Sequence, residues 1–210
     1  MAVPTRLESL LRKKCGNGVP LQELLAQMDA YDWDSVEDIP VNEEERRTRL
    51  RYLNEVIDAS GIELNGSILD LACGVASLAY LYPDVVAVDD DPQKIKVLRK
   101  DRIKGVVTDI ERLPFEGKGF DYVVSISPPQ RRIKILQRDE RDSYVRFHPD
   151  QYYNRRIVDA ALRIARKKVL IASLPIALEP PHEHMIEQRS TDGYHYVIYG
   201  VNNSNKILGP

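Results

Sequence analysis

The chain has 210 residues and a net charge of −2, and 30% of its residues are charged and 43% hydrophobic. This length and composition are typical of one globular domain with an extension. A slightly acidic chain argues against binding polyanions over the whole surface, although it leaves room for a local basic patch. The two cysteines, Cys15 and Cys73, are too few for a disulfide framework or a zinc site, so we expect no metal.

The sequence lacks the segments that lead a protein into or across a membrane. No apolar stretch approaches the roughly 20 residues that cross a bilayer. The N-terminus, MAVPTRLESLLRKKC, has neither the apolar run nor the cleavage site of a secretory signal. We therefore expect a cytoplasmic protein without membrane contact.

Residues 1–60 are predicted to form a helical extension. Apolar residues recur at helical spacing near 7–11 and 21–28. A third helix is predicted to begin after Asn42, a capping residue that three glutamates follow. Its apolar face consists of Leu50, Leu53, Val56 and Ile57. We expect this extension to cover the main domain, residues 61–210, as a cap.

From Ser67 onward, short apolar runs alternate with helical stretches. Strands are predicted at residues 68–71, 85–88, 106–107, 122–126 and 169–172. Helices are predicted at residues 76–82, 92–101 and 150–166. This alternation predicts a parallel sheet with helices on both faces. The tail at 193–200 is typical of an edge strand, which we expect to pair antiparallel with residues near Ile207.

A turn of small residues follows the first predicted strand. Residues 72–76, Ala-Cys-Gly-Val-Ala, connect this strand to the next helix, and Asp70 lies just before them. In doubly wound sheets, ligands bind at the carboxyl ends of the strands, where backbone N–H groups face the crevice. Small residues leave room for such a ligand. Tight packing of strand on helix would favour the same residues, so the turn alone leaves both interpretations open.

Three acids follow the second predicted strand, in Asp89-Asp90-Asp91-Pro92. Asp91 before Pro92 is typical of a helix start, a capping residue followed by proline at the first helical position. Asp89 therefore has a different task. A carboxylate at the tip of this strand can accept both hydroxyls of a ribose, at about 1.5–3 kcal/mol for each charge-assisted bond. The alternative is that Asp89 only extends the capping cluster.

The third predicted strand leads into TDIERLPF at residues 108–115. The carboxylate of Asp109 can accept the amino group of an adenine, because an ionised carboxylate is a pure acceptor. The side chain of Ile110 can pack on the adenine ring. An adenosine-like ligand is therefore the expected class.

Together these segments resemble the class I methyltransferases that depend on S-adenosylmethionine (SAM). The resemblance covers residues 66–174 and rests on four motifs in order: LDLACG, VVAVDDDP, TDIERLPF and FDYVVSISPP. It implies a Rossmann-like, seven-stranded, mostly parallel sheet with helices on both faces, and SAM as the cofactor. It also implies a cofactor site with Asp70 and Gly74 at the methionine part, Asp89 at the ribose, and Asp109 and Ile110 at the adenine. Ala72 and Asp90 are the further candidate cofactor-binding residues.

Two features depart from the family's pattern. Ala72 and Ala76 stand where the family usually has glycine, and alanine fits there if the backbone keeps a negative φ. The helix after the turn must also be short, because Asp70 and Asp89 are close in the sequence. A dinucleotide dehydrogenase, the competing interpretation, would need G-x-G-x-x-G, of which only Gly74 is present.

Ser127-Pro128-Pro129 follows the fourth predicted strand. By the resemblance this position faces the methyl group, so these three are the candidate catalytic residues. Consecutive prolines have fixed φ and no N–H, which leaves their carbonyls as rigid acceptors for an amino group. The segment is similar to the Asp/Asn/Ser-Pro-Pro-aromatic motif of enzymes that methylate base amines, with Gln130 in place of the aromatic residue. The alternative is two prolines that merely end a strand.

The next segment is basic and bears on the substrate. It includes Arg131, Arg132, Lys134 and Arg138, with Tyr144 and Phe147 further along. Cations and stacking aromatics beside an active site suit RNA. A charged surface loop with local ion pairs fits the same residues, and TDIERLPF is similar to the motif of methyltransferases that act on small molecules.

We therefore expect SAM-dependent methyl transfer to a nitrogen or oxygen acceptor, with RNA preferred as the substrate. Methyl transfer to a small molecule is one alternative. A SAM-binding regulatory or partner subunit without turnover is the other.

Overall fold

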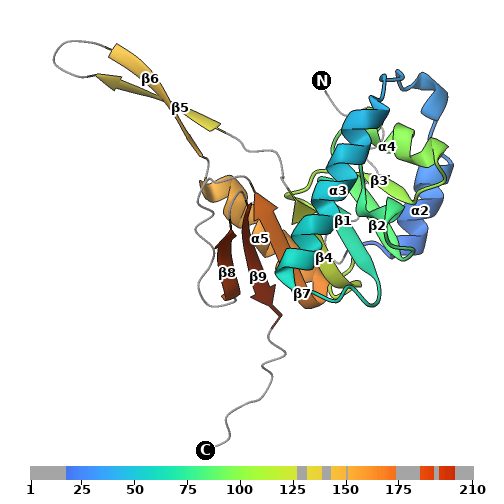
Figure 1. Cartoon of the computed structure of the whole chain (residues 1–210). Helices are drawn as coiled ribbons and strands as arrows, with labels where there is room; N and C mark the ends of the chain where they lie inside the picture. Colours follow the sequence, from blue (N-terminus) through green and yellow to red (C-terminus); the bar gives the residue numbers. More distant parts are fainter. Residues whose placement is uncertain are drawn as a thin grey trace, which may run out of the picture.

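A computed structural model of the chain describes residues 18–126, 132–138, 143–149, 151–173, 185–191 and 194–201 (Figure 1). Side-chain surroundings are described for 18–126, 156–172 and 197–201. The predicted helix near 7–11, the segment 127–131 and Ile207 lie outside the described residues. Within the described ranges, no helix is both long and apolar enough to span a membrane.

One large sheet runs through the molecule. Its strands lie in the order β3 (Gly105–Val107), β2 (Val85–Asp89), β1 (Ile68–Leu71), β4 (Phe120–Ile126), β7 (Ala165–Ser173), β9 (Tyr194–Gly200) and β8 (Met185–Thr191). The first five strands pair in parallel, whereas β9 pairs antiparallel with both β7 and β8. The mostly parallel, Rossmann-like α/β fold expected from the sequence is confirmed.

The antiparallel edge differs from the prediction. The strand expected at 193–200 is present as β9, but its neighbours are β7 and β8, so the expected pairing with residues near Ile207 is wrong. The sequence analysis missed β8 because MIEQRST has no run of β-branched or aromatic residues. The backbone hydrogen bonds to β9 hold β8 in a strand although its residues have low strand propensity.

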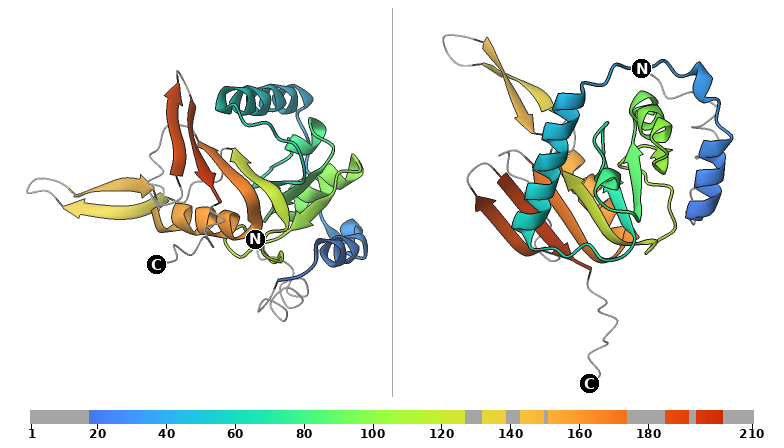
Figure 2. Two further views of the ribbon diagram at one scale, coloured as in Figure 1. Left: turned by 90° about the horizontal axis from the view of Figure 1, so that it is seen from below. Right: turned by 45° about the vertical axis from the view of Figure 1, so that its right-hand side comes forward.

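Helices cover both faces of the sheet, as expected (Figure 2). One face carries α2 (Leu21–Asp29), α4 (Pro92–Lys100) and α5 (Gln151–Ile164), whose buried residues cluster with Leu69 and Leu71 of β1. The other face carries α3 (Glu43–Ser60), which clusters with Ile68 of the same strand. Because successive side chains of a strand point to opposite faces, β1 contributes to both layers of the core.

Helix α3 is a layer of the domain rather than an appendage. The Asn42 side chain accepts the backbone N–H groups of Glu44 and Glu45 at 3.1 and 3.2 Å, which confirms the predicted helix start. The helix ends at Gly61, whose φ of 63° is typical of glycine at a helix C-terminus. Its buried residues against the sheet are Leu53, Val56, Ile57 and Ser60.

The helix predicted at 76–82 is wrong in extent. The structure has a single 3₁₀ turn there, η2 (Leu78–Tyr80), capped by the hydroxyl of Ser77. Pro83 disfavours helical backbone at the residue before it, and β2 already begins at Val85. A second 3₁₀ turn, η1 (Trp33–Ser35), lies between α2 and α3.

The basic segment contains a hairpin that the sequence analysis did not predict. β5 (Arg132–Arg138) pairs antiparallel with β6 (Ser143–Pro149), between β4 and α5 in the chain. In Figure 1 the hairpin projects away from the main sheet.

Candidate functional site

The carboxyl ends of β1, β2 and β4 meet where the strand order reverses. From β1 the chain continues to β2 and β3 on one side, and then crosses to β4 on the other side of β1. Ligands of open α/β sheets bind at such a switch point. A cavity of about 860 Å³ is lined by the residues that follow β1 and β2, and its volume suits a small molecule.

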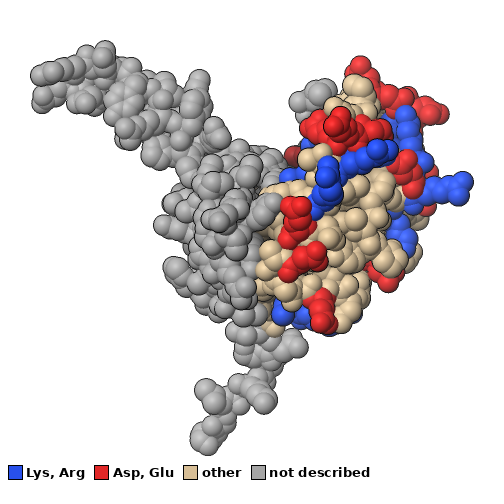
Figure 3. Space-filling view, in the orientation of Figure 1, with Lys and Arg blue, Asp and Glu red and all other residues tan. Residues whose placement is uncertain are grey.

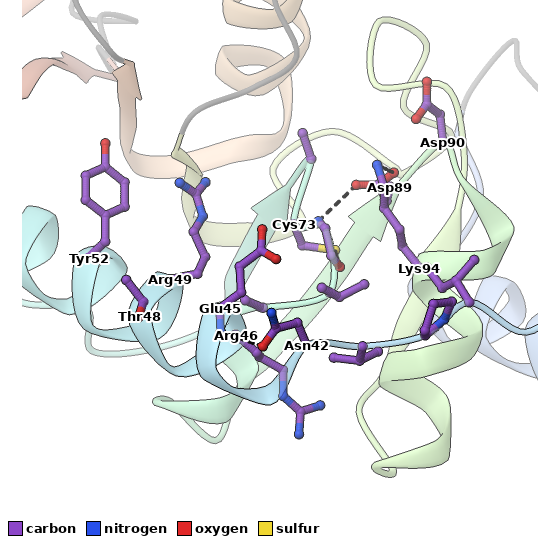
Figure 4. A pocket seen from close by; sticks show the side chains of 17 residues that line it. Asn42, Glu45, Arg46, Thr48, Arg49, Tyr52, Cys73, Asp89, Asp90 and Lys94 are labelled. Atoms are coloured by element: carbon purple, nitrogen blue, oxygen red, sulfur yellow. Dashed lines mark hydrogen bonds and ion pairs between the residues drawn. The ribbon is translucent and has the colours of Figure 1, made fainter.

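Two walls enclose this cavity (Figure 4). The strand wall consists of residues 72–76, which follow β1, and Asp89, Asp90 and Lys94, which end β2 and begin α4. The helix wall consists of residues 39–42 together with Glu45, Arg46, Thr48, Arg49 and Tyr52 of α3. Within these two walls, the sequence analysis named candidate cofactor residues in the strand wall only.

Asp70 lies beneath the strand wall. Its side chain is 3% exposed, and Oδ2 accepts a hydrogen bond from the Ser77 hydroxyl at 2.7 Å and from the backbone N–H of Leu78 at 2.8 Å. Burial raises the pKa of this carboxyl to about 6, although both hydrogen bonds and the charge of Arg49 oppose the rise. Asp70 therefore holds the end of the turn against β1, and its contact with a ligand stays a prediction.

The turn of the strand wall has two left-handed residues, Ala72 with φ 59° and Gly74 with φ 63°. The condition under which alanine fits without strain, a negative φ, is not met at Ala72. This conformation costs an L-residue roughly 1–2 kcal/mol. A hydrogen bond of 3.0 Å from Cys73 N to Val88 O keeps the turn against β2. At Gly74 an added Cβ would meet no atom within 4 Å, so the wall is open to the cavity at this point.

Asp89 occupies the tip of β2 and is 3% exposed. Its Oδ2 accepts the N–H of Gly74 at 3.0 Å, while Oδ1 accepts the N–H of Asp91 at 3.1 Å. The ammonium of Lys94 lies 3.2 Å from the same Oδ1. Asp91 has the separate task predicted for it, because its side chain caps α4 through the N–H of Gln93.

The other predicted cofactor residues differ in whether they line the cavity. Asp90 lines the cavity, and partial burial and the adjacent charge of Asp89 raise the pKa of its carboxyl. Asp109 is exposed and accepts the N–H of Glu111 at 2.9 Å. Ile110 is 2% exposed and packs in the core. Neither Asp109 nor Ile110 is among the residues that line the cavity, so the adenine assignment stays a prediction.

Ion pairs hold the helix wall onto the domain. Arg46 donates to the Tyr80 hydroxyl and to the Asp101 carboxylate, each at 3.0 Å, and so connects α3 to η2 and to the residue after α4. Asp38 pairs with Lys96 at 3.0 Å and with Lys100 at 2.7 Å, both on α4. The segment that carries 39–42 is thereby fixed at one end to α4 and at the other to the start of α3.

Arg49 connects the helix wall to β4. Its Nη2 donates to the carbonyl of Ile126 at 2.6 Å, although the two residues are 77 positions apart in the sequence. The guanidinium also lies 5.0 Å from the centre of the Tyr52 ring. Burial lowers the pKa of Arg49, and the nearby charge of Asp70 opposes this effect. Ile126 is the last residue of β4 and directly precedes Ser127-Pro128-Pro129, which lie outside the described residues.

A polar stripe on α3 was the available signal for the helix wall. Glu45, Arg49 and Tyr52 recur at helical spacing, as do the apolar residues that face the sheet. The same pattern is typical of a solvated helix face, and only the neighbouring strand ends show that the stripe lines a cavity.

The site holds no group of residues that points to metal or thiol chemistry in the described part of the chain. Among the described residues, no three histidine, cysteine or acidic side chains gather to hold a metal ion. Cys73 lines the cavity, but burial raises the pKa of its thiol well above its ordinary value. The neutral thiol is a weak nucleophile.

Comparison with known proteins agrees with this geometry. Residues 69–127 match the model of a methyltransferase domain family. A protein of Pyrococcus horikoshii (PH0226) is 20% identical, with 76% of this chain and 92% of that chain covered and a TM-score of 0.54. A possible histamine N-methyltransferase of Thermotoga maritima is 13% identical, with 77% and 95% covered and a TM-score of 0.53.

A third solved structure was determined with SAM bound. It is the magnesium protoporphyrin IX methyltransferase of Synechocystis, 14% identical, with 79% of this chain and 87% of that chain covered and a TM-score of 0.50. No curated protein sequence matches the chain. At these identities the likeness shows the fold. Residues 69–127 thus match a methyltransferase domain family, and the chain shares its fold with solved structures that are named as SAM-dependent methyltransferases.

Proposed function

We propose that this protein binds SAM in the cavity and transfers its methyl group. The observation that carries the proposal is the Asp89 carboxylate, which lines the cavity at the tip of β2 beside the N–H of Gly74. The volume of about 860 Å³ and the open space at Gly74 fit a nucleoside with an amino-acid tail. The family match over 69–127 favours methyl transfer over other nucleotide chemistry.

The chain's part in the reaction is binding and orientation. SAM supplies an electrophilic methyl group on a sulfonium. Asp89 can accept the ribose hydroxyls once Lys94, whose side chain is 37% exposed, leaves Oδ1. Ser127-Pro128-Pro129 stay the candidate catalytic residues, because the chain places them directly after β4. Their oxygens would orient a nitrogen or oxygen acceptor for in-line displacement, and such orientation lowers the barrier.

RNA is the proposed acceptor, through the hairpin β5–β6. Arg132, Lys134 and Arg138 stand at alternate positions of β5, and alternate positions of a strand belong to one face. Phe147 is the register partner of Lys134. One face of the hairpin thus combines basic positions with an aromatic one, the composition that suits a nucleic-acid backbone and its bases. Arg131, in the segment before β5, would add to this charge.

Figure 3 shows the charges on one face of the described residues. There, acidic and basic side chains of the described residues are interspersed. Affinity for RNA depends on concentrated positive charge, so this face is less suited to RNA than the hairpin is.

A small-molecule acceptor is the second candidate. The helix wall closes one side of the cavity with residues 39–42 and α3, which suits an acceptor that fits inside. Two of the similar structures are named as methyltransferases of a small molecule, one for possible histamine and one for magnesium protoporphyrin IX.

One labelling experiment separates these functions. The purified protein is incubated with methyl-labelled SAM and cell extract, and the products are fractionated into RNA, protein and metabolites. We expect label in RNA. Label only in the metabolite fraction would favour the second candidate. SAM binding without any labelled product would instead favour a regulatory or partner subunit, and a protein that binds no SAM would contradict the whole proposal.

The role of the hairpin is tested by the salt dependence of RNA binding. The affinity should fall with salt, with a log–log slope near −0.7 for each phosphate contacted. Replacing Arg132, Lys134 and Arg138 with glutamine should make the slope less steep. The control replaces Arg47, Arg51 and Lys104, three exposed cations outside the hairpin, and should leave the slope unchanged. Equal slopes in the two variants would exclude the hairpin.

A further inference from the structure

Arg49 is a cationic side chain that lines the cavity on the helix wall, opposite Asp89 of the strand wall. It lies on α3, lines the cavity and is anchored by its hydrogen bond of 2.6 Å to the carbonyl of Ile126. The Tyr52 ring, 5.0 Å away, supports the guanidinium from the same helix. A guanidinium has five N–H donors in a planar fork and matches a carboxylate in a bidentate arrangement. The anchoring at one edge therefore orients the group as a receptor for an anion.

The three cations of the cavity differ in what surrounds them. Lys94 pairs with Asp89, at the ribose end. Arg46 donates hydrogen bonds to Glu43, Tyr80 and Asp101, none of which lies at the end of a strand. Arg49 donates to the backbone carbonyl of Ile126, at the end of β4. Figure 4 shows Arg49 and Asp89 on opposite sides of the turn at Cys73.

A ligand that spans these two sides must present hydroxyls at one end and a negative group at the other. SAM has this arrangement, because its ribose and its amino-acid carboxylate lie on opposite sides of the sulfonium. We propose that Arg49 binds the carboxylate of SAM and so selects the intact amino-acid tail. The proposal rests on the proposed function, since it names a residue of the same site, and it assigns a binding role to the helical extension.

The test compares SAM with decarboxylated SAM, which lacks only the carboxylate. Calorimetry measures the affinity of both ligands for the wild type, Arg49→Met and Arg49→Lys. We expect Arg49→Met to weaken SAM binding ~10- to 100-fold and decarboxylated SAM binding less than ~3-fold, as for the loss of a charge-assisted pair. Arg49→Lys should fall between, because it keeps the charge and loses the fork. Arg47→Met, an exposed arginine of the same helix, is the matched control and should bind both ligands as the wild type does.

Each other outcome overturns a different statement. Equal weakening of both ligands in Arg49→Met would mean that Arg49 only positions the end of β4, through Ile126. Unchanged SAM affinity would exclude any contact. A wild type that binds neither ligand would overturn the proposed function itself. Binding of decarboxylated SAM by Arg49→Met also shows that the variant is folded, so loss of SAM binding cannot then reflect unfolding.

Discussion

The strand wall of the cavity is held by buried hydrogen bonds, whereas the helix wall is held by ion pairs at the surface. In the strand wall, Asp89 is 3% exposed and its contacts are short and local, to Gly74, Asp91 and Lys94. In the helix wall, Asp38 bridges Lys96 and Lys100 with a side chain that is 61% exposed. Exposed pairs of this kind contribute little and are screened by salt.

This difference between the two walls indicates that they have different roles. The strand wall is fixed by the fold itself, because removing one of its hydrogen bonds leaves a buried polar group unsatisfied. The segment before α3, residues 36–42, is held by exposed pairs and can shift without that penalty, so it is the side that can admit a ligand. Substitutions in the strand wall should therefore alter stability as well as binding, whereas those in residues 36–42 should alter binding or local mobility alone.

The largest effect is expected at Asp89. Asp89→Ala removes the proposed ribose acceptor and should weaken SAM binding at least ~10-fold, since a charge-assisted hydrogen bond contributes about 1.5–3 kcal/mol. Calorimetry with SAM measures the change. The matched control is Asp91→Ala, which removes the cap of α4 and should cost about 1 kcal/mol of stability without changing the affinity. Wild-type affinity in Asp89→Ala would refute the ribose assignment.

The next largest effect is expected from Asp70, which should make the free energy of unfolding depend on pH. Its pKa is about 6 in the fold, above the ordinary 3.8, so between these values the folded state holds more protons than the unfolded state. Stability should therefore fall as pH rises from about 4 to about 6 and then stay level, by at most ~3 kcal/mol. Asp70→Asn cannot ionise and should lack this fall. The measurement is the free energy of unfolding in urea at each pH.

Asp121 provides the control of opposite sign. Burial opposes the shift, but the N–H of Ser67 and the charges of Arg166 and Lys167 hold the pKa of Asp121 below its ordinary value. Its contribution to stability is present above the ordinary pKa and is lost as pH falls. Asp121→Asn should therefore remove stability at neutral pH and flatten the acid side of the profile. Identical profiles in wild type and Asp70→Asn would contradict the role assigned to burial.

A smaller effect is expected at Ala72. Ala72→Gly removes the strain of φ 59° and should raise the free energy of unfolding by about 0.5–1 kcal/mol, after the greater freedom of glycine in the unfolded chain is deducted. Ala76→Gly is the control, because Ala76 is buried and is not among the left-handed residues. It should destabilise by about 0.5–1 kcal/mol. Chemical denaturation compares the two, and destabilisation by both would mean that Ala72 is not strained.

The smallest effect is expected in the helix wall, at Asp38. Asp38→Asn removes both ion pairs to α4 and should speed amide hydrogen exchange in residues 36–42, with little change in melting temperature. The difference from wild type should vanish near 1 M salt, where the screening length is about 3 Å. Asp29→Asn, which breaks a pair between α2 and α4, should leave exchange in 36–42 unchanged. A large fall in melting temperature would remove the distinction between the two walls.

The strand wall could be predicted because its signals are local. Asp91 before Pro92 marks the start of α4 within two residues, which leaves Asp89 as the acid at the strand tip. Asn42 likewise marks the start of α3 through bonds to residues two and three positions away. Alternation of apolar runs with helical stretches was sufficient for the parallel sheet, since this pattern follows from burial on both faces.

The backbone conformation of the turn and the fate of Ile110 depended on packing. Ala72 adopts a left-handed φ against its own preference, while Cys73 bonds to β2. Ile110 is apolar and follows a strand, which fits a ring contact as well as a core position, and the core holds it. Propensity does not distinguish such alternatives because tertiary contacts outweigh it.

The sequence by itself determined the parallel strands, the starts of α3 and α4 and the acid at the tip of β2, because neighbours a few residues away signal each of them. Only the tertiary structure decided what faces that acid across the cavity. Arg49 meets Ile126 over a separation of 77 residues, and no local pattern records that contact. The residues at the strand ends therefore predicted the class of ligand. The packing of α3 on the sheet completed the cavity.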